Sequence, residues 1–146
     1  MSDTRQLATF WADGLLFGVD VTRVQEVIRF QAMTTVPLAN EVVHGLINLR
    51  GQIVTALDLR TRLELAPRAP TERPMNVIVR TDDGTVSLLV DEIGDVLEVS
   101  QDSWEAAPAT LQGVARELIT GAFKLKECLL LVLDADKTTD VTAVAA

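Results

Sequence analysis

The chain has 146 residues, the size of one ordinary domain, so its length excludes multi-domain machinery. Its 13 basic and 21 acidic side chains give a formal charge of −8, which disfavours nucleic acid or an anionic membrane surface as a partner. Hydrophobic residues make up 48% of the chain, enough to build a core without disulfides. The longest apolar run, 128–133, is too short to cross a bilayer, so we expect no direct membrane insertion.

The first sixty residues predict two β-hairpins and one short helix. Alternating apolar residues and the turn signals Asp13-Gly14 and Gly51 predict paired strands at 6–12 with 15–19 and at 45–50 with 52–57. Between the hairpins, Val21, Val24 and Ile28 recur at helical spacing after a potential capping residue, Asp20. This spacing predicts a helix over 21–27.

Residues 66–74 include three prolines and predict an irregular connector between two halves of the chain. Beyond the connector, 75–81 and 85–90 are predicted to form a hairpin around Asp82-Asp83-Gly84, and further extended segments are predicted at 96–99, 118–125 and 127–133. The last of these is apolar after its first residue, as expected of a strand covered on both faces. Many short strands with turn signals favour barrels or a sandwich.

The two halves of the chain contain similar segments. Residues 45–58 align without a gap with residues 121–134, sharing a glycine, a basic residue, much of the apolar pattern and a terminal aspartate. Upstream, Val19-Asp20 and VQEV at 24–27 correspond to Val90-Asp91 and VLEV at 96–99. Two matches in the same order indicate a duplicated substructure, and its two small units should share apolar surface and leave a groove between them.

Catalytic chemistry finds little support in the sequence. His44 is the only histidine, and Cys128, the only cysteine, falls in a predicted buried strand, so a nucleophile pair would require a long-range coincidence. Asp134 and Asp136 lie at an element end, where carboxylates cap backbone N–H groups or face water. Neither glycine-rich phosphate motif is present, and scarce aromatics with a negative charge disfavour a barrel that binds single-stranded nucleic acid.

Binding surfaces are the remaining functional signal. The guanidinium of Arg50, beside the turn glycine, either anchors an interface or pairs with an internal carboxylate such as Asp58. Val24 and Glu26 lie on a short amphipathic segment, where they either recognise a partner or serve as a core residue and a solvated charge. The residues alone leave both alternatives open.

Four segments of the chain, taken in order, resemble the CheW-like domain family of chemotaxis coupling proteins. They are FGVDVTRVQEVI, GLINLRGQIVTALDLRTRL, LLVDEIGDVLEV and ITGAFKLKECLLLVLDADK, and the similarity extends from about Gln6 to Lys137. The resemblance implies a mainly β fold of two intertwined five-stranded SH3-like β-barrel subdomains with a few short helices, within one domain spanning 1–146. Thr55 is a departure, because the family often has proline at this position.

The resemblance also implies a non-catalytic adaptor without a cofactor. Such an adaptor joins the regulatory domain of a CheA-type histidine kinase to the cytoplasmic tip of methyl-accepting chemoreceptors, and is cytoplasmic, recruited to membrane receptor arrays through these partners. By matching motif, the resemblance assigns partner contacts to Val24, Glu26, Arg50 and Ile53, and further contacts on flanking strands to Ser87 and Val96. It assigns structural roles to Gly51, as the tight turn, and to Asp58, as a cap of the following segment.

Overall fold

The computed structural model describes residues 4–36, 41–69, 71–82, 84–109, 111 and 113–140, and its fold is mainly β. The strands are β1 Thr4–Ala12, β2 Leu15–Asp20, β3 Val24–Ile28, β4 Val43–Leu49, β5 Gln52–Asp58, β6 Met75–Thr81, β7 Gly84–Val90, β8 Glu92–Ser100, β9 Trp104–Glu105, β10 Ile119–Lys124 and β11 Leu129–Leu133. The short helices are η1 Val21–Arg23, α1 Leu59–Arg62, η2 Gln101–Ser103, α2 Val114–Leu118 and α3 Ala135–Thr139.

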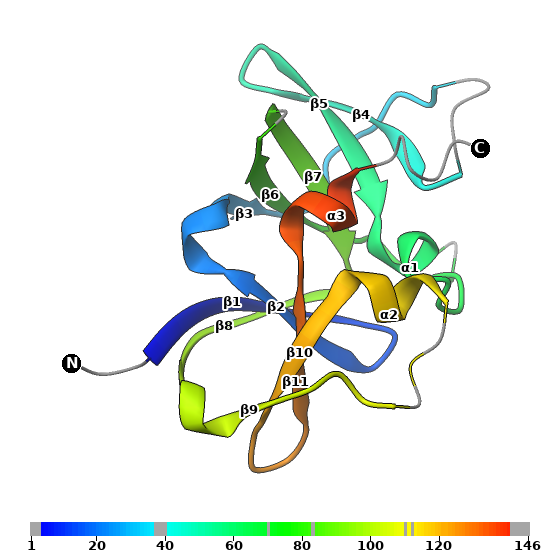
Figure 1. The fold of residues 1–146 in the computed structure, drawn as a ribbon. Coiled ribbons are helices and arrows are strands. Elements are labelled where there is room, and N and C mark those ends of the chain that lie inside the picture. The colour runs from blue at the N-terminus through cyan, green and yellow to red at the C-terminus, as the bar shows by residue number, and fades with distance from the viewer. Residues whose placement is uncertain are drawn as a thin grey trace.

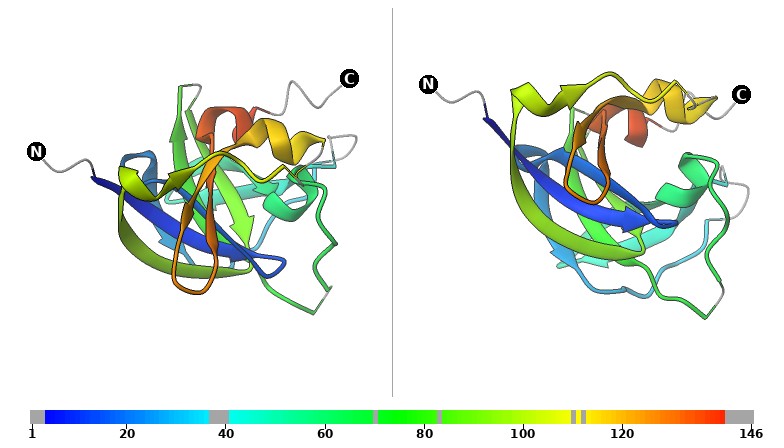
Figure 2. Two further views of the ribbon diagram at one scale, coloured as in Figure 1. Left: turned by 60° about the horizontal axis from the view of Figure 1, so that its bottom comes forward. Right: turned by 90° about the horizontal axis from the view of Figure 1, so that it is seen from below.

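The strands form two curved sheets. One has six strands in the order β8-β1-β2-β11-β10-β9, and the other has five in the order β3-β6-β7-β5-β4. The six-stranded sheet exceeds the expected five because the two-residue strand β9 is added at its edge. Figure 1 shows the three α-helices along the border between the sheets, and Figure 2 shows how strongly the strands curve. The SH3-like architecture implied by the sequence resemblance is confirmed.

The predicted hairpins are confirmed, because turn residues and alternation are local signals. Asp13 and Gly14 both have positive φ, 51° and 76°, in the two-residue loop between β1 and β2. Such loops need this left-handed conformation to match the twist of the flanking strands. Hairpins β4–β5 and β6–β7 also pair antiparallel, as predicted, and the extended segments predicted near the end of the chain form a further antiparallel hairpin, β10–β11.

The helix predicted over 21–27 is wrong. Only Val21–Arg23 is helical, as one 3-10 turn in which the Asp20 carboxylate accepts from the Thr22 N–H, and Val24–Ile28 forms strand β3. Strand β3 pairs with β6, about fifty residues later in the chain. Long-range pairing therefore overrides the local helical spacing of the valines.

The duplicated segments occupy equivalent places in the two sheets. Residues 45–58 lie in hairpin β4–β5 and residues 121–134 in hairpin β10–β11, and their second strands pair in parallel with β7 and β2, respectively. Strand β3 pairs with β6, and β8 pairs with β1. The order β3-β6-β7-β5-β4 thus matches β8-β1-β2-β11-β10, and each sheet takes strands from both halves of the chain.

Among the residues that the structure describes, three apolar clusters hold this arrangement together. The main cluster lies between the sheets and includes Phe10 and Phe17 from one sheet and Leu57 and Leu88 from the other. The other two clusters lie within the individual sheets. The prediction that Cys128 lies in a buried strand is wrong. Cys128 is only half-buried, and it precedes β11.

Candidate functional site

The β4–β5 turn presents Arg50 in an unusual backbone conformation. Arg50 and Gly51 form the two-residue loop between Leu49 and Gln52, with φ values of 52° and 88°. Asparagine or glycine is the favoured residue at the first position of such a turn, whereas a long side chain there carries conformational strain. An arginine at this position therefore indicates a use for its side chain rather than a requirement of the turn.

The Arg50 guanidinium lies against the carboxylate of Glu26 on β3. Its Nη1 is 3.0 Å from Glu26 Oε1, and its Nη2 contacts Oε2 to complete a two-pronged pair. The hydrogen bond from Arg50 lowers the pKa of Glu26 below its usual value, and the same bond raises the pKa of Arg50. Since β3 and β4 are opposite edges of the five-stranded sheet, this contact shows that the sheet curls toward closure.

The Glu26–Arg50 pair is open to solvent. The Arg50 side chain is 66% exposed and the Glu26 side chain 26%. Exposed ion pairs contribute little to stability, so this pair is poorly explained as a structural brace. The alternative of pairing with Asp58 does not occur, because the partners of the Asp58 carboxylate are Arg68 and the Arg60 amide.

Exposed apolar side chains accompany this pair. Ile53, on the same hairpin as Arg50, is 61% exposed, and Val27, which follows Glu26 along β3 and points to the opposite side of this strand, is 45% exposed. Val24 is half-buried and packs against the main cluster. Val27 was missed from the sequence because the predicted helix hid the extended conformation of β3, and a register shift between Val24 and Glu26 interrupts the alternation of faces along this strand.

Val96 and Ser87 lie apart from the Glu26–Arg50 pair. Val96 is 57% exposed on β8, in the other sheet. Ser87 has no exposed surface: its hydroxyl donates to Asn76 Oδ1 at 2.7 Å, and Asn76 Nδ2 donates to the carbonyl of Arg29 just beyond β3. Ser87 therefore braces β7 and β6 against the end of β3 and offers no surface to a partner.

Gly51 and Asp58 lie at the two ends of β5. The Gly51 N–H donates to Asn48 Oδ1 at 2.8 Å, within the turn. The Asp58 carboxylate caps α1 by accepting from the Arg60 N–H at 3.0 Å, and it also accepts from Arg68 Nη1 at 3.1 Å. The connector is thus tied to the end of β5 by a buried arginine that sequence reasoning had not singled out.

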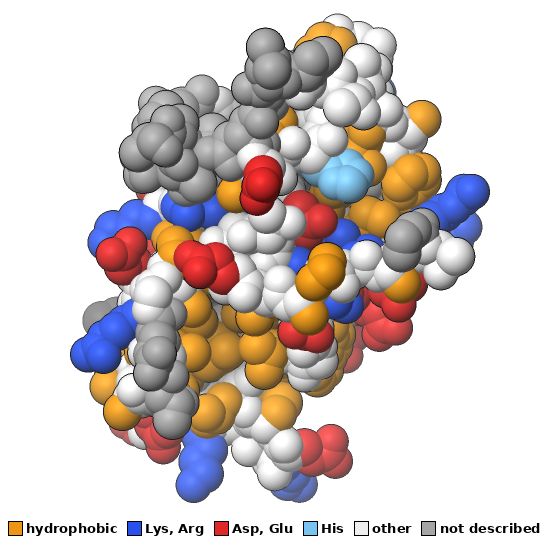
Figure 3. Space-filling model, turned by 90° about the vertical axis from the view of Figure 1, so that its right-hand side faces the viewer, with side chains coloured by type: hydrophobic (Ala, Val, Ile, Leu, Met, Phe, Trp, Pro, Cys, Tyr) orange, Lys and Arg blue, Asp and Glu red, His pale blue; other side chains and the backbone are white. Residues whose placement is uncertain are grey.

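Two hollows flank the connector. The first, about 520 Å³, is lined by Trp11, Arg60 and Asp91 among others, and the second, about 440 Å³, by Phe30, His44 and Asp58 among others. Both linings include Arg68, whose side chain is 6% exposed and already pairs with acidic residues. On the face shown in Figure 3, basic and acidic side chains lie next to one another across the middle of the molecule. This mixture does not favour a ligand of one charge.

The described residues do not assemble a catalytic or metal centre from the side chains considered above. His44 is on β4 of one sheet, and Cys128 packs with the apolar cluster of the other. Asp134 caps α3, and Asp136 pairs with Arg23. Within these residues, histidine, cysteine and carboxylate side chains form no group of three that could hold a metal ion. None of the helices described has the length and hydropathy of a bilayer span.

Residues 6–142 match the CheW-like domain family. The chain belongs to this family. Among its CheW relatives, the chemotaxis protein CheW of Bacillus subtilis is 31% identical over 135 residues, covering 92% of this chain and 86% of the relative. The chemotaxis protein CheW of Treponema pallidum is 30% identical over 136 residues, covering 90% of this chain and 80% of that protein.

The fold also matches a solved CheW structure. The crystal structure of the scaffolding protein TtCheW from Thermoanaerobacter tengcongensis aligns with a TM-score of 0.83, covering 97% of this chain and 94% of that one. Sequence identity in this comparison is 24%, so the match establishes the fold. The family resemblance of the four sequence segments is confirmed.

Proposed function

We propose that this chain is a non-catalytic chemotaxis adaptor that links the cytoplasmic tip of chemoreceptors to the regulatory domain of a CheA-type histidine kinase. The observation that carries the proposal is the 30–31% identity, over most of both chains, to proteins named chemotaxis protein CheW. A cytoplasmic location at membrane receptor arrays follows if both partners bind. The chain would supply contact surfaces, and the kinase would carry out the catalysis.

The Glu26–Arg50 pair and the apolar side chains near it are the proposed receptor-facing contacts. Val24, Glu26, Arg50 and Ile53 combine an exposed, two-pronged charge pair with apolar surface. A helical receptor tip of matching polarity would bury the apolar part and exchange hydrogen bonds with the pair. Val96, on the other sheet, is proposed as a contact at the far side of the same surface.

An adaptor transmits a signal only if its affinity differs between the states of its partners. A bridge with equal affinity for every kinase and receptor arrangement would assemble an array without changing kinase activity. Modest individual contacts are sufficient, because multivalent packing raises the effective concentration of each binding surface. Exposed, weakly stabilising contacts such as the Glu26–Arg50 pair suit a surface that must exchange partners.

Arg50→Glu tests the receptor-facing assignment. The substitution places a second carboxylate beside Glu26, so we expect affinity for a purified receptor-tip fragment to fall at least about tenfold. Arg50→Asn removes the guanidinium while keeping a residue that the turn favours, and should also weaken binding without loss of folding. Calorimetric or fluorescence titration would measure both variants.

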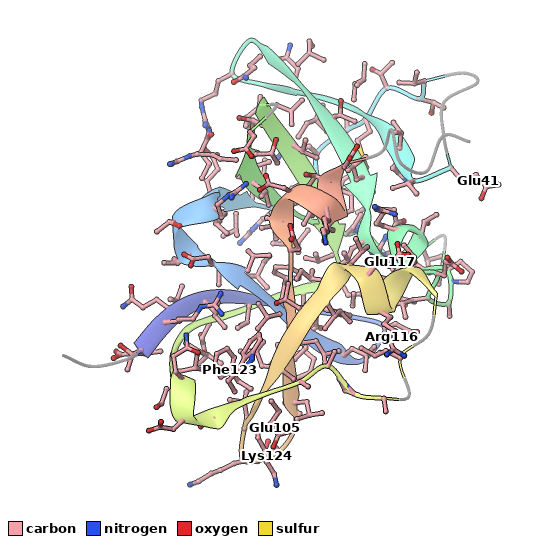
Figure 4. The ribbon with its side chains drawn as sticks, in the orientation of Figure 1. Glu41, Glu105, Arg116, Glu117, Phe123 and Lys124 are labelled. Carbon is pink, nitrogen blue, oxygen red and sulfur yellow. The ribbon has the colours of Figure 1, made fainter. Side chains whose placement is uncertain are left out.

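Arg116→Glu provides the matched control, because Arg116 is exposed on α2, away from the β4–β5 turn (Figure 4). The three variants should bind the kinase regulatory domain as the wild type does. Wild-type receptor affinity in Arg50→Glu would overturn the contact assignment. Failure of the unmodified chain to bind either a receptor tip or a kinase regulatory domain would overturn the adaptor proposal itself.

A further inference from the structure

The chain crosses between the two sheets at two equivalent points. The first crossover is η1, which leads from β2 in the six-stranded sheet to β3 in the five-stranded sheet. The second is Asp91, which leads from β7 in the five-stranded sheet to β8 in the six-stranded sheet. Strand β3 carries Val24 and Glu26, and β8 carries Val96. Both crossovers therefore open directly onto strands of the proposed contact surface.

Each crossover is fixed to a different helix by an ion pair. Arg60 on α1 holds Asp91 with two hydrogen bonds, Nη2 to Oδ2 at 2.6 Å and Nε to Oδ1 at 3.0 Å. Arg23 in η1 pairs with Asp136 on α3 and also donates from Nε to the carbonyl of Arg80 at 2.9 Å. Arg60 and Asp136 occupy equivalent positions just beyond the two duplicated segments, two residues after Asp58 and Asp134.

A buried arginine connects the two helices. Arg62 on α1 is 5% exposed, and it donates from Nε to the carbonyl of Thr138 at 2.9 Å and from Nη2 to that of Lys137 at 2.8 Å. These carbonyls lie in the last turn of α3, where the partial negative charge of the helix C-terminus favours a cation. Burial lowers the pKa of Arg62, since desolvation opposes its charge. The position therefore depends on these carbonyl contacts to retain a buried cation.

We propose that these contacts form a relay that couples the two crossovers. The relay runs from Arg23 through Asp136 and α3 to Arg62, and then through α1 and Arg60 to Asp91. A displacement of β3 at one crossover then changes the position of β8 at the other, and the reverse holds equally because coupling between two sites is reciprocal. The relay gives the proposed adaptor a means to respond across both sheets when one strand is engaged.

The alternative is that each contact stabilises only its own surroundings. Ion pairs at element junctions often act in this way, and a continuous chain of contacts does not by itself demonstrate coupling. The two possibilities differ in how far from a broken ion pair the structure changes. The biological purpose of the relay rests on the proposed function, but its existence is testable in the isolated chain, so failure of one proposal is distinguishable from failure of the other.

Amide hydrogen exchange of the full chain, followed by NMR, tests the relay. Asp136→Asn breaks the pair at the first crossover, and the partly exposed site should tolerate the change. We expect exchange of the β8 amides to accelerate by about threefold or more relative to the β4 amides, through local opening. Glu127→Gln is the matched control, because it makes the same carboxylate-to-amide change at an exposed residue of the β10–β11 turn, outside the relay, and should leave β8 exchange unchanged.

Arg62→Met tests the middle of the relay while retaining an unbranched apolar side chain. In this background, adding Asp136→Asn should produce no further acceleration in β8, because the connection is already lost. Arg23→Gln breaks the same pair from the other side and should reproduce the effect of Asp136→Asn. Acceleration confined to η1, β3, β6 and α3, a uniform change in β8 and β4, or equal effects of Asp136→Asn in both backgrounds would overturn the relay.

Discussion

Asp91 shows how one carboxylate organises its surroundings. It receives hydrogen bonds from Arg60, from Arg68 Nε at 3.1 Å and from the N–H of Asp13 at 2.8 Å, so helix, connector and the β1–β2 turn meet at this residue. Burial alone would raise the pKa of Asp91, but these hydrogen bonds and the charge of Arg60 outweigh it and lower the pKa below the reference value of 3.8. The ionised form is therefore the one that stabilises the fold.

Asp91→Asn should destabilise the chain by roughly 2 kcal/mol at pH 7, because Arg60 and Arg68 would lose a carboxylate partner. A group with a lowered folded-state pKa contributes stability above its unfolded pKa and loses it as the pH falls through the folded pKa. The difference in unfolding free energy between wild type and variant should therefore shrink below about pH 4. Urea denaturation at several pH values would measure this.

The control for this measurement is Asp102→Asn, which makes the same chemical change at an exposed residue of η2. Its unfolding free energy should stay close to that of the wild type at neutral pH. A difference between wild type and Asp91→Asn that stays constant from pH 7 to pH 3 would contradict the role of the Asp91 charge.

At the scale of elements, the sequence predicts what depends on near neighbours. The hairpins could be predicted because Asp13-Gly14 and Gly51 mark turns and the flanking residues alternate. Strand β3 could not be predicted in this way, because Val24–Ile28 is extended only through its pairing with the distant strand β6. The ionic partner of Arg50 stayed undecided for the same reason, since Glu26 approaches it only when the five-stranded sheet curls.

Two equivalent glycines allow close crossings at the two duplicated hairpins. A Cβ at Gly45 would lie 2.8 Å from the carbonyl oxygen of Thr34, which bridges to Leu46 beside it. A Cβ at Gly121 would overlap the ring of Trp104 in β9. Glycine at the start of each duplicated segment therefore has a packing reason: it admits a strand-like segment against the first strand of each hairpin.

Gly45→Ala and Gly121→Ala should each lower the unfolding free energy by about 2 kcal/mol, because overpacking forces backbone or ring to move. Gly121→Ala should also change the fluorescence of Trp104 as β9 is displaced. Gln52→Ala, at an exposed position of β5, is the control and should have little effect. Wild-type stability in both glycine variants would show that the neighbouring segments adapt without cost, contrary to this account.

At the scale of the whole molecule, the two halves of the chain exchange strands, so the duplication does not produce two separate units. Residues before the connector supply β1 and β2 to one sheet and β3, β4 and β5 to the other, and residues after it complete both. The sequence revealed the duplication, and the family resemblance implied the intertwining. Periodicity alone does not show which half supplies each neighbouring strand, because the parallel pairs β2–β11 and β5–β7 join distant segments.

Fragments 1–70 and 71–146 should therefore be unfolded separately and should fold when mixed. Each fragment alone leaves both sheets incomplete, and the main cluster loses the apolar side chains supplied by the other half. Circular dichroism should show strand signal only in the mixture, and size exclusion should show one complex with one copy of each fragment.

A division at 90–91, which leaves β6 and β7 with the first fragment, tests the same account. Fragment 1–90 retains the complete five-stranded sheet and should show more strand signal than fragment 1–70. Cooperative unfolding of fragment 1–70 by itself would mean that one half forms its own core, against the interdependence inferred from the strand order.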